Sequence, residues 1–213
     1  CAAFELPFAR DERFGAEAPP LNVKLRPDDL LVYAALQRHL PFALPFDRLQ
    51  NPIAFRAGER SIDVAGFGVL GKTQTGMEFE KLAKQVDVLH YGSEADFVLR
   101  LRPREVGEEI ILARIAPGAS LAETVDLLRP KLAAAPARPK LAALQPGDAL
   151  KIPMIRLDVE KVFDDLVHKS FENASLKGMF IADARQHIAF QLDEKGADVR
   201  SEAQVHVKSS FES

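Results

Sequence analysis

One stretch of the sequence has the residue types and spacing of a phosphate-binding loop. It reads G-x-x-x-x-G-K-T, and its defining positions are Gly66, Gly71, Lys72 and Thr73. In such a loop the backbone amides hold the phosphates, the lysine reaches the β and γ oxygens, and the threonine binds Mg²⁺. A strand-like run, Ser61–Ala65, precedes the motif as nucleotide binding requires.

The residues that follow this motif favour a different interpretation, a glycine-rich turn between two strands. The helix behind a phosphate loop should be continuous, but Gly76 falls where its first turn would form and weakens it. A second acidic residue at a strand end is needed for Mg²⁺, and Asp183 is the one candidate. Nucleotide binding is therefore the less favoured interpretation.

Other patterns of catalysis or metal binding are absent from the sequence. None of the five histidines is spaced from a cysteine, a carboxylate or another histidine in a recognised metal-binding pattern. No serine lies in the G-x-S-x-G pattern of a nucleophile elbow. We therefore expect no catalytic residue, no metal site and no cofactor, and we predict that the chain is not an enzyme.

The single cysteine is the first residue of the sequence. Cys1-Ala2-Ala3 resembles the start of a bacterial lipoprotein, in which this cysteine is acylated after the signal peptide is removed. This interpretation predicts a lipid anchor at Cys1 and an extracellular, periplasmic or cell-envelope location. The alternative is that Cys1 is merely the residue at which the sequence begins and carries no lipid. In that case the protein could also be cytoplasmic.

Charge and length narrow the class of partner. The net charge is −3, and lysine and arginine are scattered among acidic residues. Because no basic stripe is present for a phosphate backbone to follow, we expect no nucleic-acid partner.

No apolar run approaches the roughly 20 residues that cross a bilayer, so we expect no membrane span. The chain is long enough for one sizeable core or two small ones.

The clearest β-structure lies in three neighbouring runs with short connections. Val86–Tyr91, Phe97–Arg102 and Glu109–Ala116 are rich in strand-forming residues. In the second run, Phe97, Leu99 and Leu101 fall on one face of a strand, and Val98, Arg100 and Arg102 fall on the other. Three such runs in sequence predict an antiparallel meander.

Three helices are predicted: one from a capping box, one from the spacing of apolar residues, and one short helix at Met77–Gln85. Ser120-Leu121-Ala122-Glu123 is a capping box that opens a helix carrying Leu121 through Leu132. Apolar residues from Val159 to Val167 share one helical face behind Asp158. Met77–Gln85 is the third candidate. The apolar run Leu30–Leu36 fits either a strand or a helix.

Short strands interleaved with a few helices predict an α+β fold built mostly of antiparallel sheets. We expect residues 1–20 to form an arm or linker and residues 21–213 to form one domain. Within that domain, residues 133–148 are an alanine- and proline-rich connection, and His187–Leu192 is a strand. The charged break at 193–196 then leads into a loop-like tail at 197–213.

Several segments, in the same order, resemble parts of a serpin. Phe190–Ala197, which reads F-Q-L-D-E-K-G-A, is similar to the serpin hinge, where a central strand runs into the reactive-centre loop. Asp29–Leu36, followed by Pro45-Phe46, resembles the sheet-A strand that leads to a Pro-Phe. Residues 76–101 resemble the entry to sheet B, and Ile152–Ile155 the strand after it. The resemblance covers residues 28–203 and implies the architecture of the C-terminal half of a serpin.

The resemblance also implies a mechanism. In serpins the loop after the hinge is bait for a serine or cysteine peptidase, and after cleavage it inserts into sheet A as an extra strand. Alternate residues of the inserted segment then point inward, beginning here with Ala197. The resemblance assigns hinge and loop positions to Glu194, Gly196, Ala197, Val199 and Ser201.

The sequence departs from the family in ways that bear on this mechanism. The run Ala197–Ala203 is not alanine-rich, the chain is far shorter than a full serpin, and the strands that should follow the loop are not found before Ser213. We therefore favour a non-enzymatic, non-inhibitory binding or scaffold protein whose partner is another protein. A serine peptidase inhibitor that acts through the loop after Gly196 is the second hypothesis. A nucleotide-binding protein is the third.

Overall fold

The computed structural model describes residues 29–57, 60–71, 76–133 and 143–210. Within these ranges the chain is mostly β-structure, with α1 (Gly76–Ala83), α2 (Leu121–Ala133) and the short 3-10 helix η2 (Ala174–Leu176). The predicted α+β class is therefore confirmed. None of the helices in the described ranges has the length and apolar character needed to span a membrane.

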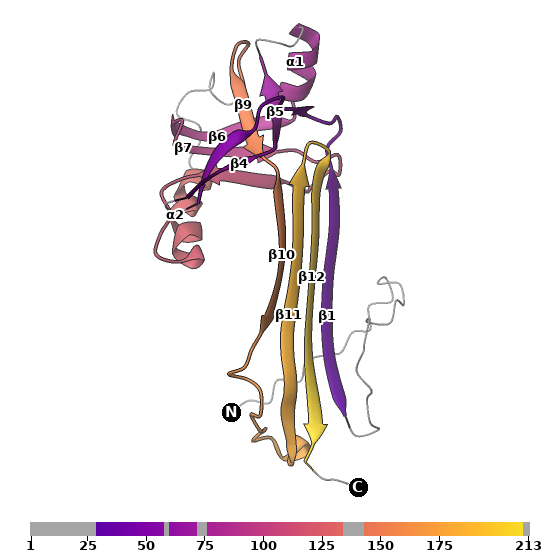
Figure 1. Ribbon diagram of the computed structural model, residues 1–213. Coiled ribbons are helices and arrows are strands. Elements are labelled where there is room, and N and C mark those ends of the chain that lie inside the picture. Colours follow the sequence, from indigo (N-terminus) through magenta and orange to yellow (C-terminus); the bar gives the residue numbers. More distant parts are fainter. Residues whose placement is uncertain (1–28, 58–59, 72–75, 134–142, 211–213) are drawn as a thin grey trace. The chain divides into compact units, whose positions relative to one another are not determined.

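Four sheets are formed by the described strands (Figure 1). The largest has the order β1-β12-β11-β10, and the others are β2-β5-β9, β6-β7-β8 and the pair β3-β4. The strand bounds are β1 (Leu30–Pro41), β2 (Asp47–Arg48), β3 (Ile53–Ala57), β4 (Arg60–Val64), β5 (Gly66–Leu70), β6 (Val86–Ser93), β7 (Asp96–Leu101), β8 (Ile110–Arg114), β9 (Ala149–Pro153), β10 (Ile155–Val162), β11 (Met179–Asp193) and β12 (Gly196–Ser209).

The chain divides into two compact units, and neither is a continuous stretch of sequence. Unit 1 comprises Cys1–Ala35, Glu160–Gln186 and Glu202–Ser213, and unit 2 comprises Leu36–Val159 and His187–Ser201. The boundary between the units falls within each of the four strands of the large sheet.

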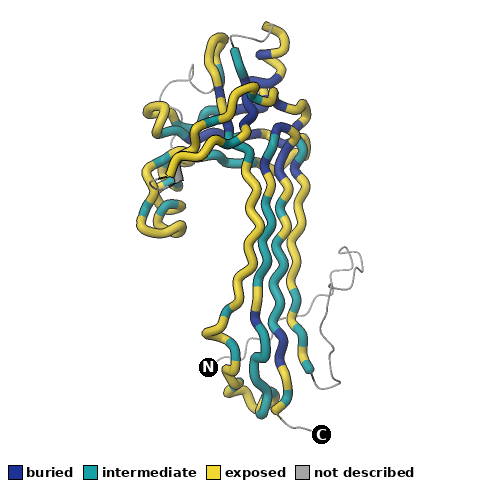
Figure 2. The backbone as a smooth tube through the Cα atoms, viewed as in Figure 1, coloured by how far each residue is buried: buried dark blue, intermediate teal, exposed yellow. Residues whose placement is uncertain are grey.

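Unit 2 contains the main hydrophobic core. Three phenylalanine rings lie at its centre, with Phe42 packed edge-on against Phe46 at 4.8 Å between ring centroids and Phe67 beside both. Leu192 and Ala197, on either side of the turn between β11 and β12, belong to the same cluster. The turn is therefore anchored in the best-packed part of the unit (Figure 2).

Unit 1 contains a buried polar pair that joins β12 to the residue before β1. His206 on β12 and Asp29, which precedes β1, have side chains only 5% and 3% exposed, with His206 Nε2 3.2 Å from Asp29 Oδ2. Ala184 and Val207 supply buried apolar side chains. Unit 1 is therefore more polar inside than unit 2.

Three of the predicted elements are confirmed. The meander is β6-β7-β8, paired antiparallel throughout. The capped helix is α2: the Glu123 amide donates to Ser120 Oγ at 3.2 Å, although the Glu123 carboxylate accepts from Ala119 and not from Ser120. The short helix is α1. The ambiguous run at Leu30–Leu36 is strand, as part of β1.

The helix predicted from Val159 to Val167 is wrong. Ile155–Val162 is β10, a strand whose eight residues are all exposed. Apolar and charged residues alternate from Ile155 to Glu160, and this two-residue period fits a strand better than a helix. β11 lies beside it in the sheet and provides the pairing that the sequence pattern alone did not show.

The glycine-rich turn predicted at 66–71 is also mostly strand. Gly66–Leu70 is β5, paired antiparallel with β9 and nearly all buried. A Cβ at Gly68 would collide with the Leu150 carbonyl, so glycine allows the two backbones to approach closely. A Cβ at Gly71 would collide with the Asp148 carbonyl, and a Cβ at Gly66 would meet the side chains of Ile53 and Leu49. Packing therefore accounts for these glycines without a ligand.

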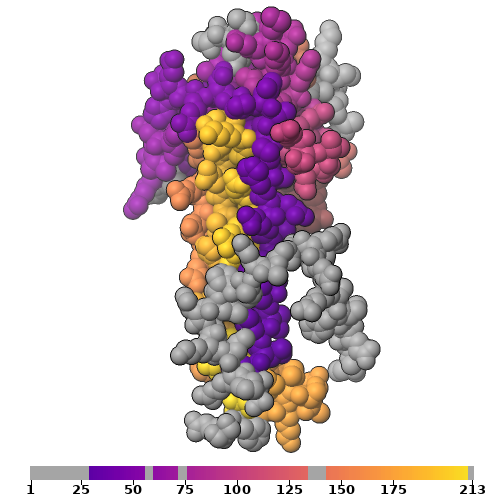
Figure 3. Space-filling view, turned by 90° about the vertical axis from the view of Figure 1, so that its right-hand side faces the viewer, coloured from indigo at the N-terminus to yellow at the C-terminus, as the bar shows by residue number. Residues whose placement is uncertain are grey.

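The loop-like tail predicted at 197–213 is wrong as far as Ser209. This segment is β12, which lies between β1 and β11 in the large sheet. Figure 3 shows β1 in indigo and β12 in yellow side by side. The resemblance to the serpin hinge suggested a loop here, but a strand with neighbours on both edges gains two ladders of hydrogen bonds that the sequence of the segment does not reveal.

Candidate functional site: the turn between β11 and β12

The predicted hinge residues lie at the tight turn that joins β11 to β12. Asp193 ends β11, Gly196 begins β12, and Glu194 and Lys195 form the turn between them. The Lys195 amide donates to Asp193 Oδ1 at 2.8 Å, a side-chain bond typical of turns. Burial opposes the charge on Asp193, but bonds from the Lys195 and Gly196 amides and from Gln191 outweigh it and lower the pKa of this carboxyl.

The segment that follows β1 holds this turn in place. The Phe42 amide donates to the Lys195 carbonyl and the Phe46 amide to the Glu194 carbonyl, each at 2.8 Å. Two core residues therefore satisfy the carbonyl groups of the turn directly. A backbone fixed at both turn residues has little freedom to swing as a hinge.

Gly196 has no room for a side chain. Its φ of 151° lies in a region that L-residues rarely adopt, and a Cβ would run into the Leu40 carbonyl oxygen and Pro41 Cα. The glycine is therefore needed for two independent reasons, backbone conformation and close approach to β1.

Glu194 is the buried charge of the turn. Its Oε1 lies 3.1 Å from Arg48 Nε on β2, and its side chain is only 12% exposed. Its Oε2 is buried and has no hydrogen-bond partner in the part of the chain that the structure describes. Arg48 was not identified from the sequence, because the ion pair joins residues far apart in the chain and no local pattern marks it.

The residues after the hinge alternate between the two faces of β12. Ala197 is 1% exposed and Val199 and Ser201 are half-buried, whereas Asp198 and Arg200 are exposed. His39 on β1 pairs with Asp198, with Nδ1 2.5 Å from Oδ1. The inward and outward positions follow the pattern that the resemblance implied, and the mechanistic role of these residues stays a prediction.

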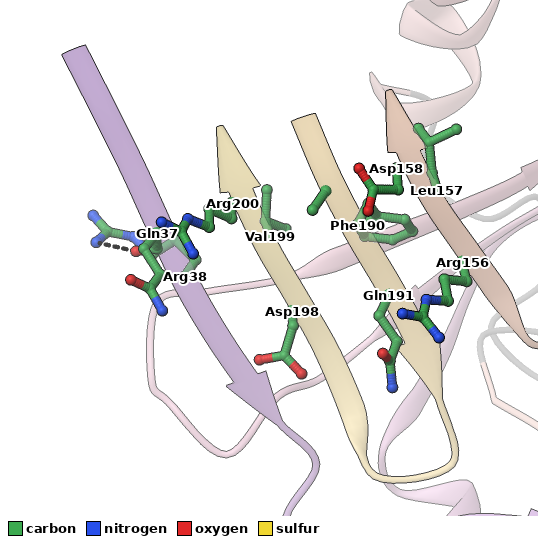
Figure 4. A pocket seen from close by; sticks show the side chains of 11 residues that line it. Gln37, Arg38, Arg156, Leu157, Asp158, Phe190, Gln191, Asp198, Val199 and Arg200 are labelled. Atoms are coloured by element: carbon green, nitrogen blue, oxygen red, sulfur yellow. Dashed lines mark hydrogen bonds between the residues drawn. The ribbon is translucent and has the colours of Figure 1, made fainter. Parts of the chain in front are cut away.

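A shallow groove crosses the four long strands within unit 2. It has a volume of about 260 Å³. Figure 4 shows Arg156 and Arg200 together with Asp158 and Asp198 among the side chains that line it. Because charges of both signs are interleaved, the groove favours neither an anion nor a cation, and its residues do not form a nucleophile–base pair.

The remaining candidate sites fall partly outside the described residues. Lys72 and Thr73 lie outside the described residues, so their role in nucleotide binding stays a prediction. Cys1 also lies outside them, so its lipidation stays a prediction. Among the described residues, no group of three or more histidine, cysteine or acidic side chains is arranged to hold a metal ion.

Comparison with known proteins gives a likeness in structure but not in sequence. No family model matches the chain, and no curated protein matches it as a relative. Ovalbumin from emu (Dromaius novaehollandiae) has a TM-score of 0.56 at 11% identity, over 86% of this chain and 47% of that one. The viral serpin CrmA has a TM-score of 0.60 at 12% identity, over 90% of this chain and 64% of that one.

A third solved structure, thyroxine-binding globulin complexed with a thyroxine derivative, has a TM-score of 0.58 at 12% identity, over 87% of this chain and 55% of that one. The chain thus spans about half to two thirds of the length of these structures. The predicted resemblance is confirmed at the level of architecture: the chain has a serpin-like fold over most of its length.

Proposed function

We propose that this chain is a serpin-like, non-enzymatic binding or scaffold domain that does not trap peptidases, and that its partner is another protein. The observation that carries the proposal is the position of β12. The segment after the hinge already lies between β1 and β11 as a strand of the large sheet. A cell-envelope or extracellular location is part of this proposal.

The physical reason is that a trap needs an unfilled place in its sheet. In the mechanism that the resemblance implies, insertion of the loop after cleavage releases the energy that distorts the peptidase. Here the place is filled without cleavage, and the turn at its start is fixed by Phe42, Phe46 and Arg48. A chain in this arrangement has no insertion step left to drive inhibition.

The test is to mix the chain with trypsin-, chymotrypsin- and subtilisin-like peptidases and run denaturing gels, with an inhibitory serpin as the positive control. The proposal expects no band at the summed mass and full residual peptidase activity. A band at the summed mass that survives boiling would overturn it.

Peptidase inhibition is the second candidate, and one observation favours it. Ala197, Val199 and Ser201 fit on the inner side of β12, so this segment is compatible with a position inside the sheet. A myxomaviral serine protease inhibitor, SERP-1, also shares the architecture, with a TM-score of 0.51 at 12% identity. If inhibition occurs, replacing Val199 and Arg200 together with alanine should change its stoichiometry, and no change would exclude insertion as the mechanism.

A further inference from the structure

β10 is an edge strand of the large sheet, and its free edge is available for pairing. Among the strands that the structure describes, the order β1-β12-β11-β10 leaves β10 with one neighbour, β11. All eight of its residues are exposed, and Figure 2 shows this along the whole strand. An exposed edge presents unpaired N–H and C=O groups and is a template for another strand.

The direction of these backbone groups follows from one hydrogen bond. The Phe163 amide, directly after β10, donates to the Ala184 carbonyl on β11 at 2.8 Å. Because successive residues of a strand direct their N–H and C=O groups to opposite sides, the odd-numbered residues of β10 bond to β11. The even-numbered residues, including Arg156 and Asp158, therefore present their backbone groups to the free edge.

The same two residues carry complementary charges. Arg156 makes no ion pair within the described part of the chain. Asp158 Oδ1 lies 2.6 Å from His187 Nε2, and Asp158 Oδ2 forms no hydrogen bond or ion pair with the described residues. One arginine and one carboxylate oxygen thus lie two residues apart at an open edge, on the same face of the strand.

We propose that β10 pairs antiparallel with β10 of a second copy of this chain. In one register, Leu157 of each copy lies on the two-fold axis and Arg156 of each lies opposite Asp158 of the other. The register one step to one side places Arg156 opposite Arg156, and the register one step to the other side places Asp158 opposite Asp158, although it also brings Arg156 opposite Glu160. Like charges directly opposite are destabilising. Of the three registers, the one centred on Leu157 alone forms opposite-charge pairs with no like-charge pair.

Both the apolar side chains and the backbone groups agree with this register. Ile155 of each copy lies opposite Val159 of the other, and Leu157 meets Leu157; these side chains are 39%, 45% and 46% exposed in the single chain. Arg156 and Asp158 become the hydrogen-bonded pairs, which is what their outward N–H and C=O groups require. The inference does not depend on the proposed function, because it concerns the edge strand β10, whereas the hinge lies between the inner strands β11 and β12.

The oligomeric state gives the first test, measured by sedimentation velocity with concentrations up to about 100 µM. We expect a reversible dimer, and R156E should raise its dissociation constant at least about tenfold, because two attractive pairs become repulsive. R129E on α2 is the matched control with the same charge change, since Arg129 is exposed and pairs only within its helix. The double variant R156D/D158R should restore the dimer. A wild-type monomer, or equal effects of R156E and R129E, would overturn the proposal.

Cross-linking tests the register itself. In a Cys1→Ser background, L157C should form a disulfide-linked dimer on oxidation, because Cα atoms of a non-hydrogen-bonded pair lie about 4.5 Å apart. I155C should not link to itself, since the two copies of residue 155 are separated along the strand by several residues. Equal cross-linking of L157C and I155C would reject this register. Circular dichroism of each variant confirms that it is folded.

Discussion

Gly196 shows how much of the hinge depends on one residue. Its backbone conformation excludes most side chains, and the Leu40 carbonyl occupies the place of a Cβ. The sequence identified this glycine through the resemblance, but not the reason for it. The contact with β1 became visible only in the fold, because Leu40 and Gly196 lie at opposite ends of the described chain.

We predict that G196A destabilises the chain by about 2 kcal/mol or more, from backbone strain together with the collision at Leu40. The measurement is urea unfolding followed by circular dichroism. G76A is the control, because Gly76 at the start of α1 has open space where a Cβ would lie; alanine there should be neutral or slightly stabilising. Equal stability of G196A and the wild type would contradict the close approach described here.

The contribution of Asp183, on β11, to the stability of the fold depends on pH. The hydrogen bonds from Arg185, at 2.7 Å and 3.0 Å, are the main reason why the pKa of Asp183 lies below the ordinary value of 3.8, and burial partly opposes them. A lowered pKa in the folded chain means that the unfolded chain takes up the proton first as pH falls. The stabilisation from Asp183 is therefore present above about pH 4 and is lost as the pH falls below that value.

We predict that D183N reduces the acid sensitivity of the fold. The free energy of unfolding, measured between pH 7 and pH 3, should fall less steeply for D183N than for the wild type, because the titrating group has been removed. Asp164, exposed in the turn after β10, supplies the control D164N, which should alter the slope less. An unchanged slope in D183N would show that this carboxylate contributes nothing.

At the scale of elements, the sequence was most informative where the pattern was local. The meander β6-β7-β8 followed from alternation in three adjacent runs, and α2 followed from its capping residues. β12 was missed because its strand character depends on distant partners, since it lies between two strands that are far from each other in sequence. β10 was missed because the apolar residues from Val159 to Val167 were assigned a helical period, although the alternation from Ile155 to Glu160 has the period of a strand. The ion pair of Arg48 with Glu194 was missed for the same reason.

The position of β12 makes a prediction about hydrogen exchange. A strand paired on both edges exposes its amides only when the sheet opens, so amides of β12 should exchange about as slowly as those of β11. Amides in the exposed turn from Glu105 to Gly107 provide the reference for fast exchange. Exchange in β12 as fast as in that turn would mean that the segment leaves the sheet readily, and the inhibitor hypothesis would gain support.

At the scale of the whole molecule, the question is whether the fold stores energy. A sheet with an unfilled place is metastable, and a peptidase cut in its loop raises the melting temperature because the loop then inserts. In this chain the turn at 193–196 joins two strands that are already neighbours in the sheet. The arrangement resembles the end of that reaction and not its start.

We therefore predict that a peptidase cut between Ala197 and Ser210 does not raise the melting temperature. Intact β12 should resist cutting, since a peptidase binds an extended segment that is free of the sheet. A chain that is cut after partial unfolding should melt at the same temperature as the intact chain or lower, because one covalent link of β12 is lost. Differential scanning calorimetry before and after limited proteolysis measures this directly. A rise of several degrees after the cut would show that the segment was outside the sheet in the intact chain, and the scaffold interpretation would give way to a working trap.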